Sequence, residues 1–138
     1  MRLRPCDHAE VLAVARRLQR SEPATAADDR RALLLYWYGT GATRLRGEDD
    51  VLLAAWGRHG GADHPLAAAI RADHARISDE AAAVAADGHT PAARLRHLGD
   101  ALAAHVLRQD RELRGVVEHT VPPDELAELA RSRHLVRQ

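Results

Sequence analysis

The stretch "ALAAHVLRQDREL", from Ala101 to Leu113, indicates the fold class. Its apolar residues recur every three or four positions, which is the period of an amphipathic α-helix. Extended in both directions, the predicted buried face of this helix contains Leu95, Leu98, Leu102, His105, Gln109 and Val116, with either Leu113 or Glu112 between the last two. We call such a row of buried positions an apolar stripe. His105 stands where the pattern requires an apolar side chain, so the buried face of this helix carries a polar group.

The rest of the chain is also predicted to be helical. Alanine, leucine, arginine and glutamate dominate, and helix-breaking residues gather in "SEPAT", "GRHGGADHP", "ADGHTP" and "TVPPD". The helices predicted between these breaks cover about residues 3–20, 25–58, 64–86 and 90–118, with a short fifth helix after Pro123. Short links between long helices place neighbours antiparallel. We therefore expect an all-α, up-down-up-down four-helix bundle whose fifth helix packs across one end.

Two helix starts have recognisable signals. Asp63 is followed closely by Pro65, and Thr90 directly precedes Pro91. A polar N-cap and a proline in the first turn both suit the unpaired amides at a helix start. Helices are therefore expected to begin at these two positions.

The predicted helix over residues 25–58 contains three glycines. Each costs about 0.5–1 kcal/mol relative to alanine inside a helix. The three glycines are Gly39, Gly41 and Gly47. We expect a kink or a close backbone approach at one of them.

Composition limits the function classes. The 138 residues suit one domain, and the formal net charge of +0 comes from interspersed charges, so neither a nucleic acid nor a membrane surface is expected as a partner. The single cysteine, Cys6, excludes an intramolecular disulfide. No segment is long and apolar enough to span a bilayer. We expect a cytoplasmic protein.

Polar residues interrupt the apolar stripe of every long helix. His8 does so in the first helix, Arg44 and Glu48 in the second, His74 in the third and His105 in the fourth. At about 1.5 Å rise per residue, antiparallel packing places the last four at one level, with His8 one or two turns away. These residues would form one polar layer inside the bundle.

Such a layer suits a metal ion. Buried polar groups must be paired, and histidines with carboxylates in a bundle core are ligands for iron, manganese or zinc. Asp110 lies about 140° around the helix from His105, so it would reach the layer from the flank. Gln109 is better aligned with His105, but glutamine is a poor metal ligand.

Four motifs together resemble the haemerythrin-like (HHE cation-binding) family, and the likeness covers nearly the whole chain. The motifs are "DHAEVLAVARRL" at Asp7–Leu18, "RLRGEDDVLLAAW" at Arg44–Trp56, "IRADHARI" at Ile70–Ile77 and "LGDALAAHVLRQDRELRGVVE" at Leu98–Glu118. The resemblance implies one helical-bundle domain over residues 1–138 with a di-iron centre. It also implies dioxygen or another small diatomic molecule as the ligand.

Carried over position by position, the resemblance implies a set of metal ligands, namely His8, Glu48, His74, His105 and Asp110. The sequence departs from the family pattern at three places. Arg44 stands where the family has a histidine, Gln109 where it usually has an acid, and Ser78 where the oxygen carriers have a second histidine. We therefore expect a depleted site that holds one iron or an altered pair, or another divalent metal.

Three functions remain open. The first is a metal protein that binds or senses dioxygen, nitric oxide or redox state. The second is a metal-free helical interaction module with a protein partner, in which Arg44 and Glu48, spaced i and i+4, form an ion pair that replaces the metal centre. The third is an oxygen-activating enzyme, which ranks last because the sequence offers no substrate determinant.

Overall fold

The structure is a computed structural model that describes residues 8–137, and the side chains of residues 8–131. All regular structure within these residues is helical, so the predicted all-α class is confirmed for them. None of the described helices combines the length and the apolarity needed to cross a membrane. The predicted start of the first helix near Leu3 and the single cysteine, Cys6, lie outside the described residues.

The observed helices follow the predicted ones closely. Their ends differ from the predicted ends by two residues at most, apart from the first helix's start. Three short elements are labelled η. Two of them, η1 and η3, are π-helical turns, in which hydrogen bonds join residues five apart rather than four. The third, η2, is a kink, because the backbone of His59 and Gly60 is not helical. The elements are α1 (Ala9–Gln19), α2 (Ala26–Tyr36), η1 (Trp37–Gly41), α3 (Ala42–Trp56), η2 (Gly57–Gly61), α4 (Pro65–Ala86), α5 (Ala92–Arg108), η3 (Gln109–Leu113), α6 (Arg114–Thr120) and α7 (Pro123–Arg137).

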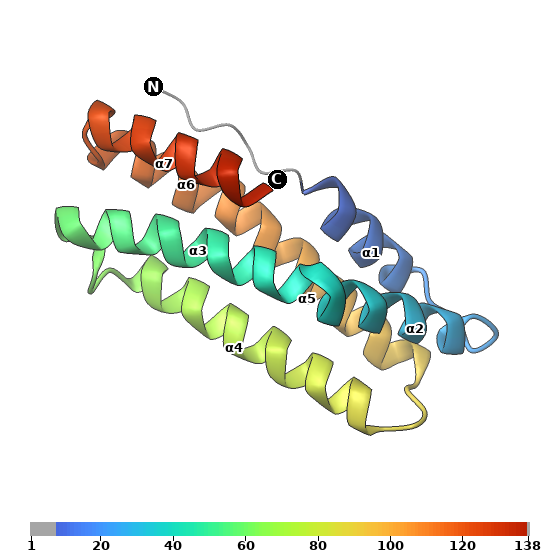
Figure 1. Ribbon diagram of the computed structural model, residues 1–138. Coiled ribbons are helices and arrows are strands. Elements are labelled where there is room, and N and C mark those ends of the chain that lie inside the picture. The colour runs from blue at the N-terminus through green and yellow to red at the C-terminus, as the bar shows by residue number, and fades with distance from the viewer. Residues whose placement is uncertain (1–7, 138) are drawn as a thin grey trace.

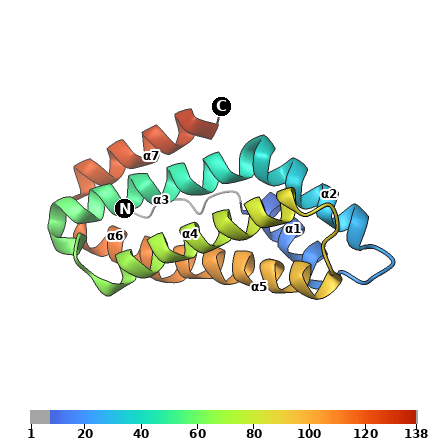
Figure 2. The same ribbon diagram turned by 90° about the horizontal axis from the view of Figure 1, so that it is seen from below.

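The π-helical turns join α-helices into longer segments. Through η1, α2 continues into α3, and through η3, α5 continues into α6 (Figure 1). The segments α1 and α4 both pack against α5, while α3 contacts α6 and α7 (Figure 2). The up-and-down order of a four-helix bundle stays a prediction at this point.

The apolar interior consists of two clusters. One, which we call the α1-side core, includes Leu18, Leu33, Leu45, Ile77 and Leu102. The other, the α7-side core, includes Leu52, Ile70, Leu113, Val117 and Leu126. The α3, α4 and α5–α6 segments each contribute residues to both cores. On each of these segments, polar residues lie between the residues of the α1-side core and those of the α7-side core. Together these polar residues form one layer.

Aromatic rings and glycines fit together at η1 and at η2. The ring of Tyr36 lies where a Cβ on Gly41 would be, and the ring of Trp56 lies where a Cβ on Gly61 would be. In each case the aromatic residue precedes the turn and the glycine ends it. The predicted interruption of the second helix is therefore confirmed at η1, whereas Gly47 lies in the regular helix α3.

Both predicted helix starts need a small correction. The N-cap of α4 is His64 rather than Asp63: Nδ1 of His64 accepts a hydrogen bond from the amide of Leu66 at 3.0 Å, and Pro65 begins the helix. The N-cap of α5 is Pro91, without a side-chain hydrogen bond. Thr90 precedes the cap by one residue and is buried. In both cases the cap is the residue after the expected one.

Gly99 tests the packing of α1 against α5. A Cβ at this position would lie 2.7 Å from the carbonyl oxygen of Ala15 and 2.9 Å from the amide nitrogen of Gln19, both backbone atoms of α1. Because backbone atoms cannot turn aside, Gly99→Ala should lower the free energy of unfolding by about 1–3 kcal/mol. Urea unfolding followed by circular dichroism measures this change.

Gly115→Ala is the matched control. This glycine is in helix α6, with no atom within 4 Å of the Cβ position, so alanine should raise the free energy of unfolding by up to about 1 kcal/mol. If Gly99→Ala were as stable as Gly115→Ala, the close contact between α1 and α5 would be wrong.

Candidate metal centre

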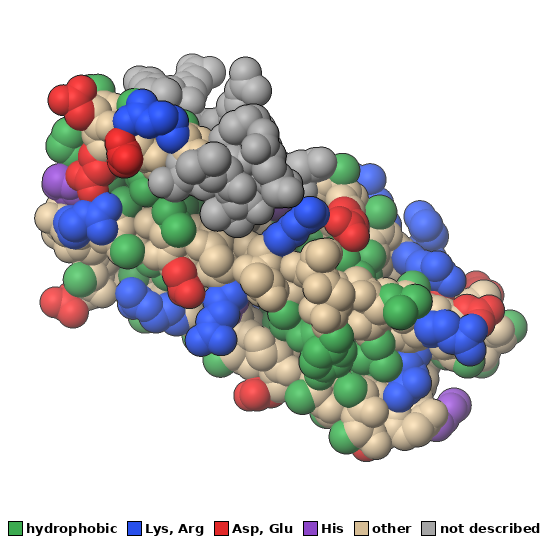
Figure 3. All heavy atoms as spheres, viewed as in Figure 1, with side chains coloured by type: hydrophobic (Ala, Val, Ile, Leu, Met, Phe, Trp, Pro, Cys, Tyr) green, Lys and Arg blue, Asp and Glu red, His purple; other side chains and the backbone are tan. Residues whose placement is uncertain are grey.

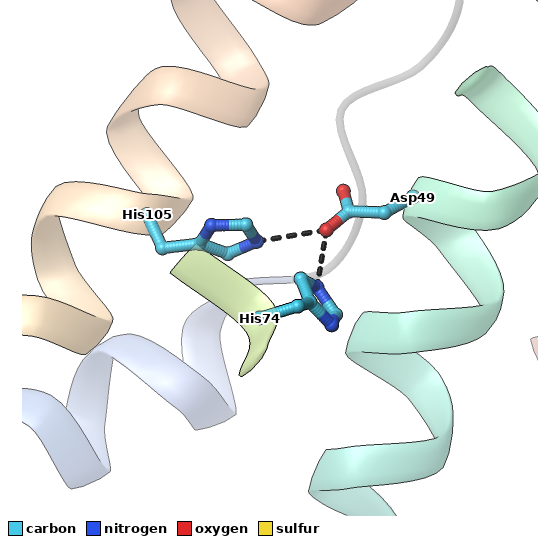
Figure 4. Close-up of side chains that lie close together, drawn as sticks. All are labelled: Asp49, His74 and His105. Atoms are coloured by element: carbon cyan, nitrogen blue, oxygen red, sulfur yellow. Dashed lines mark hydrogen bonds and ion pairs between the residues drawn. The ribbon is translucent and has the colours of Figure 1, made fainter. Parts of the chain in front are cut away.

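Three side chains from three helices converge between the two cores. Asp49 comes from α3, His74 from α4 and His105 from α5, and each offers one ligand atom within 4.8 Å of the other two (Figure 4). His105 is 0% exposed and Asp49 2%, while the His74 side chain is 15% exposed. The arrangement offers two imidazole nitrogens and one carboxylate to a single point.

Neighbours in the sequence explain why these side chains lie at one level. Asp49 falls between Leu45 of the α1-side core and Leu52 of the α7-side core. His74 falls likewise between Ile77 and Ile70 on α4. Because the apolar residues on both sides of each polar residue are buried, the polar side chains are directed into the interior. A polar layer is therefore present, with His74 and His105 in it as expected and with Asp49 as its member from α3.

Asp49 is hydrogen-bonded through both of its oxygens. Nε2 of His105 lies 2.8 Å from Oδ2, and the side-chain amide of Gln109 donates to Oδ1. Nε2 of His74 forms an ion pair with the same Oδ2, outside hydrogen-bond geometry. One nitrogen of each of the two imidazoles therefore meets a single carboxylate oxygen, as the ligands of a common ion would.

The electrostatics of Asp49 favour its charged form. Burial alone would raise the pKa of the carboxyl group. The interactions with His105 and His74 outweigh burial and hold the pKa below its ordinary value. Asp49 is therefore an anion at neutral pH, as a metal ligand must be.

A second carboxylate holds the other side of the His105 ring. Oδ2 of Asp73 lies 3.4 Å from Nδ1 of His105, and it accepts a hydrogen bond from Arg108 at 2.7 Å. Oδ1 of Asp73 accepts one from Arg76 at 3.3 Å. When Nδ1 of His105 donates to Asp73, Nε2 is left to bind an ion, which is the usual arrangement behind a histidine metal ligand.

The other three predicted ligands form a neighbouring group. Nδ1 of His8 lies 3.0 Å from Asp110, and Nε2 of His8 lies 3.7 Å from Glu48. The imidazole ring of His8 thus lies between the carboxylates of Asp110 and Glu48, with one ring nitrogen facing each of them. The Asp110 side chain is 30% exposed, in line with its expected position on the flank of the helix. Participation of His8, Glu48 and Asp110 in metal binding stays a prediction.

Arg44 does not lie in the polar layer, and its predicted place on the buried stripe is wrong. Its side chain is 55% exposed, and Nη1 forms an ion pair with Glu10 at 3.3 Å. The cause is η1, because the additional residue in the π-helical turn moves every later position of the stripe by one. Beyond Gly41 the buried positions include Leu45, Asp49 and Leu52, in place of the predicted Arg44, Glu48 and Val51, while the predicted Ala55 is buried together with Trp56.

The same shift explains the residues that the sequence analysis missed. Asp49 follows the predicted Glu48 directly, and the glycines of η1 were the available signal for a change of register. Beyond η3, in α6, the buried residue is Val117 rather than the predicted Val116. Asp73 precedes His74, and only the three-dimensional arrangement places it against His105.

Comparisons with known proteins do not assign a family. No protein-family model, no curated protein and no solved structure matches the chain. Function is therefore inferred from the residues of the polar layer.

The titration of Asp49 leads to a prediction for the metal-free protein. Because its folded-state pKa lies below the ordinary value of 3.8, Asp49 stabilises the fold above pH 3.8, and this contribution is lost as the pH falls through the folded-state pKa. Asp49→Asn should lower the free energy of unfolding by about 1.5–3 kcal/mol at pH 7. The difference from the parent protein should shrink towards pH 3.

The measurement is urea unfolding between pH 7 and pH 3 with a chelator present. Asp50→Asn is the control, because Asp50 is the next residue on α3 and its side chain is exposed. A constant difference between Asp49→Asn and the parent protein over this range would contradict the lowered pKa of Asp49.

Proposed function

We propose that this chain is a haemerythrin-like metal-binding protein in which Asp49, His74 and His105 hold one iron ion. The observation that carries the proposal is the convergence of two imidazoles and one carboxylate, from three helices, within 4.8 Å. The ligand pair His74 and His105 agrees with the family resemblance, whereas Asp49 takes the place that the resemblance gives to Glu48.

The chemistry of the donor set favours iron. Two histidines and one carboxylate are the ligands of many non-haem ferrous sites, and they leave coordination positions open. A ferrous ion so bound would supply a site for dioxygen or nitric oxide. We propose that binding or sensing such a molecule, or a change of redox state, is the function of the chain.

The surroundings of the three ligands support this function. The α1-side core and the α7-side core enclose the layer from both directions along the helices. Apolar walls restrict water and favour a small uncharged ligand. His74 is the most exposed of the three ligands, so α4 forms the side from which a small molecule would enter.

The proposed architecture is an up-down-up-down four-helix bundle made of α1, α2–α3, α4 and α5–α6, with α7 as the additional helix. Two observations support it. Successive long segments run in opposite directions along the molecule (Figure 1). The contacts of α1 and α4 with α5, and of α3 with α6, join these segments laterally.

A metal-free hydrogen-bonded network is the second candidate. It is favoured by the pairing of Asp49, whose oxygens meet both Gln109 and His105. In this case the layer would fix the register of the helices in an interaction module. Its members would be Asp49, Asp73, His105 and Gln109, while Arg44 would remain at the surface with Glu10.

Metal stoichiometry tests the main proposal. After anaerobic loading with ferrous iron and desalting, elemental analysis should find one iron per chain. The variants His105→Ala and Asp49→Asn should each lose most of this iron, because each removes one of three ligands. His97→Ala is the control and should retain it, since His97 is an exposed histidine on α5.

The possible outcomes separate the candidates. Two irons per chain would bring His8, Glu48 and Asp110 into the centre, and His8→Ala should then lower the count to one. No iron in a folded parent protein would favour the metal-free network. Full iron content in a folded His74→Ala, His105→Ala double variant would overturn the ligand assignment.

Asp73 provides a second test, through the orientation of His105. Asp73→Asn should weaken metal binding by about 10–100-fold, which is typical when the hydrogen-bond partner of a ligating histidine is changed. Co²⁺ titration reports both affinity and, through its visible absorption, ligand geometry. Unchanged affinity and an unchanged spectrum in Asp73→Asn would show that Asp73 does not position His105.

Asp79→Asn is the matched control for the Asp73 variant. Asp79 is also on α4, and its side chain is exposed. The control should match the parent protein in affinity and in absorption.

A further inference from the structure

A cavity of about 400 Å³ lies between α2 and the link between α4 and α5. In Figure 1 this is the end of the molecule that carries the start of α2, away from η2. The volume falls in the range of small-molecule sites. The ligands of the candidate metal centre are not among its lining residues.

Apolar side chains form much of the cavity wall. Ala26 is buried and Leu34 is half-buried, while Leu35 at the rim is 70% exposed. Hydrophobic side chains also gather over α2 and the neighbouring part of α4 in Figure 3. An exposed leucine beside a cavity with apolar walls favours a ligand with an apolar part.

The polar part of the wall is positively charged. Arg30 and Arg31 both line the cavity, and no aspartate or glutamate is among the described lining residues. Arg30 is fixed by hydrogen bonds to the carbonyls of Val84 and Ala85 at the end of α4. Arg31 is exposed and has no partner within the described residues. This charge distribution favours an anion.

Thr90 also borders the cavity, but it is only 3% exposed and its Oγ1 is buried. Arg31 is therefore the polar group of the wall that a ligand can reach without a movement of the chain.

We propose that this cavity binds a medium-chain alkyl carboxylate, that is, a free fatty-acid anion. The alkyl chain lies against Ala26, Leu34 and Leu35, and the carboxylate is paired with Arg31. The proposal does not depend on the metal centre, since the cavity and the polar layer share no residue.

The test uses decanoate below its micelle concentration, with the full chain. Amide chemical shifts in ¹H–¹⁵N spectra locate binding, and isothermal titration calorimetry gives the affinity. Saturable shifts confined to residues 23–35 and 88–90, with one decanoate per chain, are expected. Decyltrimethylammonium has the same alkyl chain and the opposite charge, and it should bind at least tenfold more weakly.

Two variants test the wall residues. Arg31→Glu and Leu35→Asp should each weaken decanoate binding at least tenfold, and both residues are exposed, so the fold should tolerate the changes. Arg71→Glu is the control, because Arg71 is an exposed arginine on α4 outside the cavity. It should leave the affinity for decanoate unchanged.

Other results would overturn the proposal. Shifts scattered over the molecule would indicate non-specific adsorption of the alkyl chain. Equal binding of the cationic amphiphile would exclude carboxylate recognition, and equal affinities of Arg31→Glu and Arg71→Glu would exclude Arg31. Co-sedimentation with phosphatidylglycerol vesicles, without saturable binding of decanoate, would assign the surface to a membrane instead.

Discussion

The buried carboxylate of Asp49 is the constraint on which the interior depends. An anion taken out of water must be paired and hydrogen-bonded, or it destabilises the fold by several kcal/mol. Here its partners come from two other helices, His105 and Gln109 on the α5–η3 segment and His74 on α4. The positions of three helices along one another are thus fixed by a single charge.

Apolar packing alone would leave this register less well defined. The α1-side and α7-side cores consist largely of leucine, isoleucine, valine and alanine, whose contacts tolerate small shifts. Polar groups with fixed geometry tolerate them poorly. The layer between the cores therefore combines two roles, since it aligns the helices and presents a set of ligand atoms.

The periodicity of the sequence was sufficient to predict the helices and two residues of the candidate metal centre. The extents of α2–α3, α4 and α5–α6 follow from the breakers between them, and His74 and His105 follow from interruptions in apolar stripes. Asp49 could not be predicted in this way, because a stripe with a 3.6-residue period loses its register at a π-helical turn. Asp73 could not be predicted either, because its role depends on a contact between α4 and α5.

Helix η1 also gives the chain an unusual freedom in evolution. Glu48 and Asp49 are adjacent acids, and the additional residue in the π-helical turn directs Asp49 rather than Glu48 to the two histidines. Deleting that additional residue would restore the regular helical period and leave Asp49 facing the two histidines. Regular α-helical winding of all five residues of η1 would instead turn α3 by about 100° relative to α2, and Glu48 would then face inward beside Arg44. Substitutions in η1 that favour regular winding can therefore exchange the acidic ligand for one that is a methylene longer, while every ligand codon stays unchanged.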